Sequence, residues 1–268
     1  MKRLLTLCIA LLIGCAVAAQ QPTYQFDRQI AYRASDDAYV RQMCCVDVAY
    51  PADAVSAPVI VWFHGGGLTG GERDLPKQLL ESGCVVVGVG YRLSPKATVS
   101  EIIDDAAAAV AWTFDHAQKY GGDPARIYLA GYSAGGYLVN MIGLNRAYLA
   151  RYDRSPDLLA AIVPFSGQVI THFEQRRTLG MAPLQPLVDS LAPLYHVRGD
   201  APPMLLLSGD RELELYGRYE ETAYFWRMLK LAGHKDVILY ELDGFDHGAM
   251  CQPGYQLLVK YIKNREKR

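Results

Sequence analysis

The feature that most constrains this fold is a set of six short, largely apolar runs with helical or turn segments between them. The runs cover residues 58–63, 84–89, 126–130, 160–165, 204–207 and 237–240. Strands that are apolar on both faces are typical of a parallel sheet, because helices cover both sides of such a sheet. The alternation of these runs with helices therefore predicts an α/β fold with a mostly parallel central sheet.

The segments between the runs complete this picture. Helices are predicted over residues 100–120, 134–149, 216–231 and 254–263, and a strand or hairpin over 39–50. The region before Ala38 is polar and is expected to be loosely structured. Residues 168–197 contain three prolines and break the rhythm, so we expect a cap-like excursion over the sheet. A single domain over residues 20–268 suits a chain of this length.

The first 19 residues are expected to be a secretory signal peptide. Lys2 and Arg3 precede an apolar run over residues 4–13, and small residues follow at 16–19. This pattern predicts a secreted or periplasmic protein. The alternative is a lipoprotein, because residues 12–15 resemble a lipobox and acylation of Cys15 would anchor the chain to a membrane.

Charge and cysteine content exclude several classes of function. Lys plus Arg number 27 and Asp plus Glu number 28, so the chain has no basic excess with which to bind nucleic acid. Four cysteines lie beyond the predicted signal, and they are expected to be buried thiols: Cys44, Cys45, Cys84 and Cys251. No pair of them has metal-ligand spacing, and the sequence indicates no metal and no cofactor.

The central chemical signal is the pentapeptide Gly-Tyr-Ser-Ala-Gly at residues 131–135. It directly follows one predicted strand and opens a predicted helix, which is the context of a nucleophile elbow. Gly131 and Gly135 have no Cβ to clash where the chain reverses. The pattern makes Ser133 the candidate nucleophile.

A second signal follows the strand at residues 58–63. Residues 64–67 read His-Gly-Gly-Gly, and a glycine run leaves backbone N–H groups free to approach an anion. We expect Gly66 and Gly67 to form an oxyanion hole together with the N–H of Ala134. His64 precedes this loop and is expected to be structural.

A serine hydroxyl needs a base, and His247 is the best candidate because its loop follows the last strand at the carboxyl edge of the sheet. The competing histidines lie in a helix, at the opposite edge or in the excursion: His116, His234, His172 and His196.

A carboxylate should orient the base from the segment after residues 204–207. Asp210, Glu212 and Glu214 compete for this role, and local sequence does not decide between them. The chain order Ser, acid, His is the order found in α/β-hydrolases.

These motifs, with Tyr-Arg-Leu-Ser-Pro at 91–95 and Asp-His-Gly at 246–248, resemble the α/β-hydrolase esterases related to hormone-sensitive lipase and to bacterial feruloyl and acetyl esterases. The resemblance runs from about Tyr39 to the C-terminus. It implies an α/β-hydrolase fold and, counting from Gly209, Glu212 as the acid. The family more often has Asp there, so Asp210 stays an alternative.

The resemblance implies a serine esterase that forms an acyl-enzyme on Ser133. A short region before the first strand favours small acyl groups, and export suggests acetyl or feruloyl esters of plant polysaccharide as substrates. The alternatives are a peptidase of the same fold and a non-catalytic binding protein. Arg176 and Arg177 are expected to be a solvated surface pair.

Overall fold

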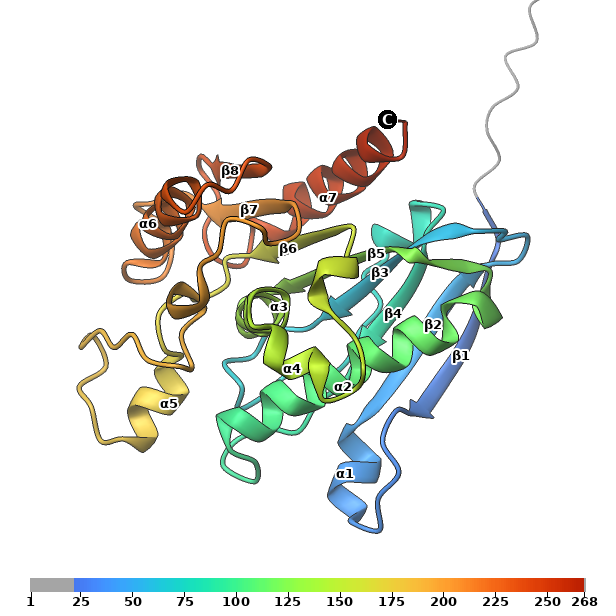
Figure 1. The fold of residues 1–268 in the computed structure, drawn as a ribbon, viewed down its shortest axis with the longest axis horizontal. Helices are drawn as coiled ribbons and strands as arrows, with labels where there is room; N and C mark the ends of the chain where they lie inside the picture. Colours follow the sequence, from blue (N-terminus) through green and yellow to red (C-terminus); the bar gives the residue numbers. More distant parts are fainter. Residues whose placement is uncertain (1–21, 268) are drawn as a thin grey trace, which may run out of the picture.

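The computed structural model describes residues 22–267, whose strands form one eight-stranded sheet (Figure 1). The strand order across the sheet is β1-β2-β4-β3-β5-β6-β7-β8. The strands are β1 (Tyr24–Ala31), β2 (Cys45–Pro51), β3 (Ala57–Phe63), β4 (Val85–Val89), β5 (Gly122–Tyr132), β6 (Ala161–Phe165), β7 (Met204–Gly209) and β8 (Val237–Leu242).

The predicted parallel sheet is confirmed for its larger part. From β4 across to β8 every neighbouring pair is parallel. At the other edge β2 is antiparallel to β4, and β1 is antiparallel to β2. In the register of the central strands, Phe63 pairs with Gly131 and Tyr132 pairs with Phe165. The segments that follow β3, β5 and β6 therefore leave the sheet side by side, at the edge where α/β sheets place their sites.

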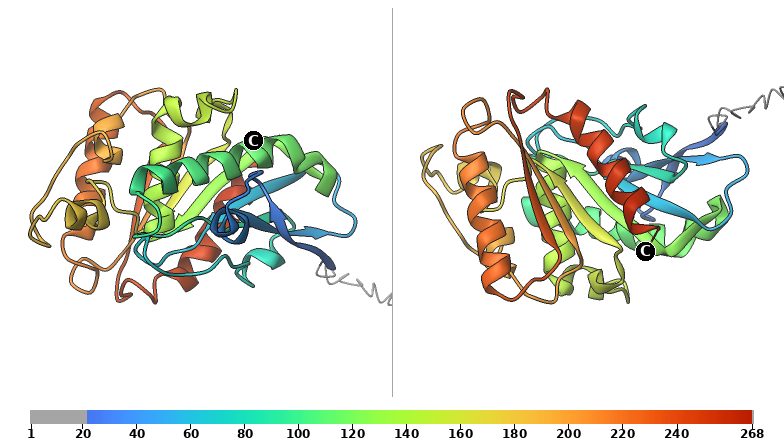
Figure 2. Two further views of the ribbon diagram at one scale, coloured as in Figure 1. Left: turned by 90° about the horizontal axis from the view of Figure 1, so that it is seen from below. Right: turned by 90° about the horizontal axis from the view of Figure 1, so that it is seen from above.

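Helices cover both faces of the sheet (Figure 2). The α-helices are α1 (Ala38–Met43), α2 (Val99–His116), α3 (Ala134–Leu144), α4 (Arg146–Ala150), α5 (Phe173–Thr178), α6 (Arg218–Leu231) and α7 (Cys251–Arg265). Short 3₁₀ turns are η1 (Leu79–Glu81), η2 (Ala117–Tyr120), η3 (Pro156–Leu158) and η4 (Pro193–His196). All four predicted helices are present, although the one expected over 134–149 divides at Asn145, whose side chain caps α4.

The two faces carry separate apolar cores. Val59 and Phe63 pack with residues of α2, α3 and α6 on one face. Ile60 and Trp62, which alternate with them, pack with residues of α7 on the other. This alternation is the two-residue period of a strand, and it explains why β3 is apolar throughout.

The N-terminal region departs from expectation. We expected loose structure before Ala38 and a strand or hairpin over 39–50, but β1 pairs with β2 as an edge strand and α1 precedes β2. Most β1 side chains face outward, so the strand has no apolar run to reveal it. Its hydrogen bonds to β2 and the bond from Tyr32 Oη to the Gly90 carbonyl (2.8 Å) hold it in place, and these are tertiary contacts.

The excursion over residues 168–197 contains α5 and η4. The expectation of a solvated arginine pair is wrong for Arg176, which is buried and donates hydrogen bonds to the carbonyls of Thr171 (3.0 Å) and Pro183 (3.2 Å). Arg177 is exposed and pairs with Glu174 at 2.7 Å. The buried guanidinium thus donates to carbonyls of a looped backbone, which have no partners within a helix or strand.

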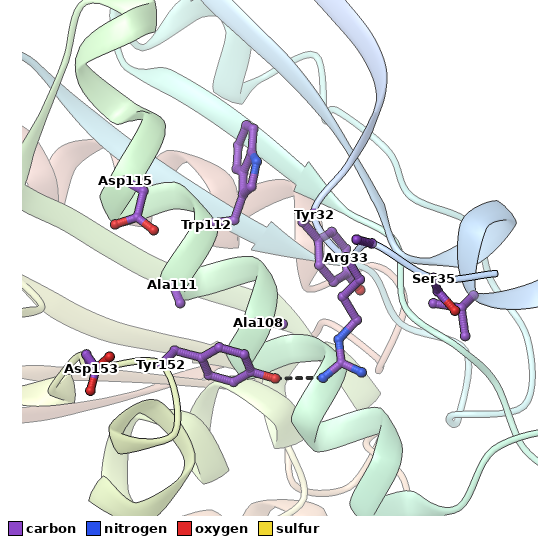
Figure 3. Close-up of a pocket in the computed structure, with 11 residues that line it drawn as sticks. Tyr32, Arg33, Ser35, Ala108, Ala111, Trp112, Asp115, Tyr152 and Asp153 are labelled. Carbon is purple, nitrogen blue, oxygen red and sulfur yellow. Dashed lines mark hydrogen bonds between the residues drawn. The ribbon is translucent and has the colours of Figure 1, made fainter. Parts of the chain in front are cut away.

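A hollow of about 510 Å³, drawn in Figure 3, lies between the segment after β1, α2 and the residues after α4. Arg33 donates a hydrogen bond to Tyr152 (2.6 Å) and pairs with Asp104 and Asp105. These charges join the N-terminal segment to α2. The hollow is lined by neither of the candidate catalytic side chains, Ser133 and His247.

The predicted signal peptide and Cys15 lie outside the described residues, so export and lipid anchoring stay predictions. Among residues 22–267, no helix is long and apolar enough to cross a membrane.

Candidate active site

Ser133 stands at the turn between β5 and α3. Its backbone adopts φ 53° and ψ −113°, a conformation that non-glycine residues rarely take and that costs free energy. Hydrogen bonds hold this turn on both sides. The Ser133 N–H donates to the Phe165 carbonyl (2.8 Å), and the Ser133 carbonyl accepts from the Tyr137 N–H (2.9 Å). The strained nucleophile elbow expected from the sequence is therefore present.

Glycine is required on both sides of this turn. A Cβ on Gly131 would lie 2.6 Å from the carbonyl carbon of Gly135, and one on Gly135 would lie 2.1 Å from the Phe63 carbonyl oxygen. Real Cβ atoms do not approach backbone so closely, so any side chain here would push α3 away from the strands. The two glycines let the helix start directly against the sheet.

The structure brings His247 to Ser133. The Nε2 atom of His247 lies 2.9 Å from Oγ of Ser133, within hydrogen-bonding distance. Asp246 holds the loop, because its carboxylate accepts from the N–H groups of Gly248 (3.0 Å) and Ala249 (2.8 Å). Tyr132, the residue before the serine, donates its hydroxyl to the His247 carbonyl at 3.0 Å.

Glu214 is the carboxylate that contacts the histidine. Its Oε1 lies 2.7 Å from Nδ1 of His247, and its side chain is 0% exposed. A carboxylate only accepts, so Nδ1–H donates to Glu214 and Nε2 is left with the lone pair that faces Ser133. The tautomer required of a general base is thus set by the acid.

The prediction that Glu212, or alternatively Asp210, is the carboxylate that orients His247 is wrong, because Glu214 makes this contact. Glu212 is exposed, and the contact this structure gives it is from its backbone N–H to the Asp210 carboxylate (2.8 Å). Asp210 also accepts from the Gly244 N–H (2.8 Å), and these backbone hydrogen bonds lower the pKa of its carboxyl group. Neither carboxylate contacts His247 in the described structure.

A turn after β7 explains why the acid lies two residues beyond the predicted Glu212. The Asp210 carbonyl accepts from the N–H groups of both Leu213 (3.0 Å) and Glu214 (2.8 Å). The chain therefore coils at the end of the strand instead of running on. The coil turns Glu212 to solvent and delivers Glu214 to the histidine.

The glycine loop after β3 lies against the elbow. A Cβ on Gly65 would lie 2.8 Å from the Tyr132 ring, and the Gly66 carbonyl accepts from the N–H groups of Thr69 (3.1 Å) and Gly70 (3.0 Å). Gly66 and Gly67 have φ values of 116° and 65°, which favour glycine. The predicted donors, with Ala134 at the start of α3, thus come from two neighbouring segments at one edge of the sheet.

His64 is buried beneath this loop, as its predicted structural role requires. Its Nδ1 donates to the Gly65 carbonyl (2.7 Å), its ring stacks on Tyr91, and its Nε2 has no hydrogen-bond partner among the described residues. Burial lowers the pKa of the imidazole to about 4. The side chain is therefore neutral at physiological pH and supports the loop through Nδ1–H.

The structure gives the remaining candidate histidines no hydrogen bond to the Ser133 hydroxyl, which contacts His247. His172 is buried at the start of α5, and burial lowers its pKa well below the usual value. His116 ends α2, His196 contacts the Ser190 carbonyl, and His234 contacts the Pro202 carbonyl. Within the described chain all four cysteines are free, and Cys251 is only partly buried. No group of three His, Cys, Asp or Glu in residues 22–267 is arranged to hold a metal ion.

Phe173 is a site neighbour that the sequence did not indicate. The tip of its ring lies 2.9 Å from the position a Cβ would take on Gly67. The ring is about one-third exposed, at 37%. The excursion thus places an aromatic side chain beside the glycine loop. The two segments are about 100 residues apart in the sequence, so only the tertiary structure shows this contact.

Comparisons with known proteins identify the family and the fold of the chain. The BD-FAE family model matches residues 46–215. The probable carboxylic ester hydrolase LipM of Mycobacterium tuberculosis is 31% identical over 72% of this chain and 49% of its own length. Esterase LipC of the same organism is 28% identical over 72% of this chain and 53% of its own. The chain thus spans about half the length of these relatives.

Two solved structures share the fold over nearly their whole length. A truncated carbohydrate esterase from gut microbiota has a TM-score of 0.76 at 17% identity, covering 94% of this chain and 99% of that one. Esterase 2 of Thermogutta terrifontis with propionate bound has a TM-score of 0.70 at 22% identity, covering 91% and 94%. The predicted α/β-hydrolase fold is confirmed by these likenesses.

Proposed function

The chain belongs to the BD-FAE family, and we propose that it is a serine carboxylic ester hydrolase with Ser133, His247 and Glu214 as its catalytic triad. One observation carries the proposal. Oγ of Ser133 lies 2.9 Å from Nε2 of His247, and the buried Glu214 carboxylate lies 2.7 Å from Nδ1 of the same ring. A nucleophile, a base and an orienting acid in this order are the parts that acyl transfer needs.

The proposed reaction has two steps. Ser133 attacks the ester carbonyl while His247 takes the hydroxyl proton and then gives it to the departing alcohol, which leaves an acyl group on Ser133. Water then attacks the acyl-enzyme, again losing its proton to His247, which returns it to Ser133. In both steps the N–H groups of Gly66, Gly67 and Ala134 would bind the negative oxygen of the tetrahedral intermediate.

The test is release of nitrophenol from p-nitrophenyl acetate. Wild-type protein should hydrolyse the ester, Ser133→Ala should lose at least about 1000-fold in kcat, and a fluorophosphonate probe should label wild type alone. Full activity in Ser133→Ala would overturn the proposal. Hydrolysis of an aminoacyl amide faster than of a matched ester would favour the peptidase alternative, and an inert, unlabelled wild type would favour a binding protein.

For the substrate, we propose a small acyl group, such as acetyl or feruloyl on plant polysaccharide. Two facts support it: Phe173 lies over the proposed oxyanion glycine, and the structural neighbours include a carbohydrate esterase and an esterase holding propionate. Acetate release from acetylated xylan, compared with release of ferulate from feruloylated arabinoxylan, would separate the two acyl groups. Release of neither would overturn this part of the proposal.

We further propose that the protein is exported, on the evidence of residues 1–19. Mass spectrometry of the mature chain from a bacterial host would distinguish the forms. A new N-terminus at Gln20 indicates free secretion, whereas an acylated Cys15 indicates a lipoprotein. Retention of Met1 would overturn both.

A further inference from the structure

Ser166 is the residue directly after β6, and its hydroxyl contacts both the base and the acid of the proposed triad. Its Oγ donates a hydrogen bond to Oε2 of Glu214, and the same oxygen lies 3.0 Å from Nδ1 of His247. A hydroxyl has one hydrogen but two acceptor lone pairs. The hydroxyl hydrogen of Ser166 points to the Glu214 carboxylate, because a carboxylate only accepts. A lone pair of Oγ then faces Nδ1–H of His247.

The position of Glu214 explains why such a contact would matter. It lies five residues beyond Gly209, the end of β7, and its neighbours Leu213 and Leu215 are exposed. No strand or α-helix holds this residue, yet its carboxylate is completely buried. A buried carboxylate is costly without donors. Ser166 supplies one from the end of a different strand, β6, so the acid is held by a neighbouring part of the sheet and not only by its own loop.

Arg218 holds Ser166 in turn. It is the first residue of α6, it is buried, and its guanidinium donates a hydrogen bond to the Ser166 carbonyl. Ser166 has φ 47°, so its backbone needs external support to stay in this conformation. The Ser166 N–H is also used, because it donates to the Leu207 carbonyl at 2.7 Å.

We propose that Ser166 and Arg218 are positioning residues for the triad acid: the Ser166 hydroxyl orients the Glu214 carboxylate toward His247, and Arg218 fixes the backbone that presents this hydroxyl. The inference rests on the proposed function of the same site. It adds to the triad one residue that contacts both the acid and the base, Ser166, and one residue that contacts Ser166, Arg218.

The first test removes the hydroxyl in two ways. Ser166→Gly relieves the backbone strain and Ser166→Ala retains it, so a shared effect belongs to the hydroxyl. Both should lower kcat for p-nitrophenyl acetate about tenfold, with KM within twofold of wild type, since a charge-assisted hydrogen bond is lost away from the substrate. The matched control is Ser208→Ala, because Ser208 is also buried, on the neighbouring β7, and its Oγ has no partner among the described residues. It should keep wild-type kcat.

A double-mutant cycle separates positioning from a general loss of structure. In a Glu214→Gln background the Ser166→Gly change should cost less than twofold, because the carboxylate that it serves is already gone. Arg218→Met should lower kcat about threefold to tenfold, and Arg218→Lys should recover part of it. Thermal unfolding of each variant identifies those that fail to fold, and Ser166→Cys, which keeps a weak donor, then replaces Ser166→Gly.

The outcomes are distinct. Additive losses in the cycle, or wild-type kcat in Ser166→Gly, would overturn the positioning role and leave the proposed esterase intact. A wild-type protein that neither hydrolyses the ester nor reacts with a fluorophosphonate would overturn the proposed function and this inference together.

Discussion

Nδ1 of His247 lies 2.7 Å from a carboxylate oxygen of Glu214, although 33 residues of chain separate them. The contact joins the coil after β7 to the loop after β8, and these parallel strands are neighbours in the sheet. Adjacent strands thus deliver acid and base to the same edge. The acid, however, arrives two residues later than the family pattern implies.

The first prediction follows from this contact. Glu214→Gln should lower kcat for p-nitrophenyl acetate about 100-fold or more, because the amide no longer stabilises the charged imidazole. Glu212→Gln is the matched control and should stay within twofold of wild type, since Glu212 is exposed. Steady-state kinetics of both variants measures the difference. If Glu212→Gln is the slower enzyme, the acid is misassigned.

The second prediction concerns the elbow. Gly135→Ala should lower the free energy of unfolding by about 3 kcal/mol or more, because the new Cβ would lie 2.1 Å from the Phe63 carbonyl oxygen. Gly180→Ala is the control. Gly180 has φ 70° but open space around it, so Ala there should cost only about 1 kcal/mol of backbone strain. Urea unfolding measures both, and equal costs would contradict the close packing of α3 on the sheet.

The third prediction concerns acyl length. Phe173→Ala should increase the octanoate-to-acetate ratio of kcat/KM for p-nitrophenyl esters about tenfold, because the ring that borders Gly67 is removed. Phe26→Ala, a similarly exposed phenylalanine on the edge strand β1, should leave this ratio unchanged. An unchanged ratio in Phe173→Ala would show that the acyl group binds elsewhere.

The fourth prediction is a pH dependence of stability. Burial lowers the pKa of His64 from 6.5 to about 4, so below pH 6.5 the unfolded chain binds a proton that the folded chain does not. Its contribution is complete above pH 6.5 and is lost as the pH falls toward 4. Between pH 7 and pH 4.5 this loss is about 2 to 3 kcal/mol.

His64→Asn provides the measurement. The variant has no titrating ring, so its free energy of unfolding should fall less than that of wild type over this interval, by about the same 2 to 3 kcal/mol. His172 shifts in the same direction and remains in both proteins, so it cancels in the comparison. Parallel curves for the two proteins would show that His64 is not the group responsible.

Much of the fold could be predicted because its signals are local. The apolar runs that became β3 to β8 have the composition of strands buried on both faces. Gly131 and Gly135 mark a turn where an added Cβ would clash with the backbone. The edge strand β1 could not be predicted, because it has no apolar pattern and is defined by its pairing with β2. The burial of Arg176 could not be predicted, because it depends on carbonyls several residues away in the chain.

The sequence by itself determined the order of β3 to β8 and of the main helices between them, the position of Ser133 at an elbow and the glycine loop beside it, because each depends on residues adjacent in the chain. Only the tertiary structure decided which of three carboxylates reaches His247, and that Ser166, Phe173 and Arg218 surround the site. Those contacts depend on how a short coil after β7 turns and on what neighbouring strands present to it. The residues that meet in these contacts lie tens of positions apart in the sequence, so no local sequence pattern predicts that they are close in space.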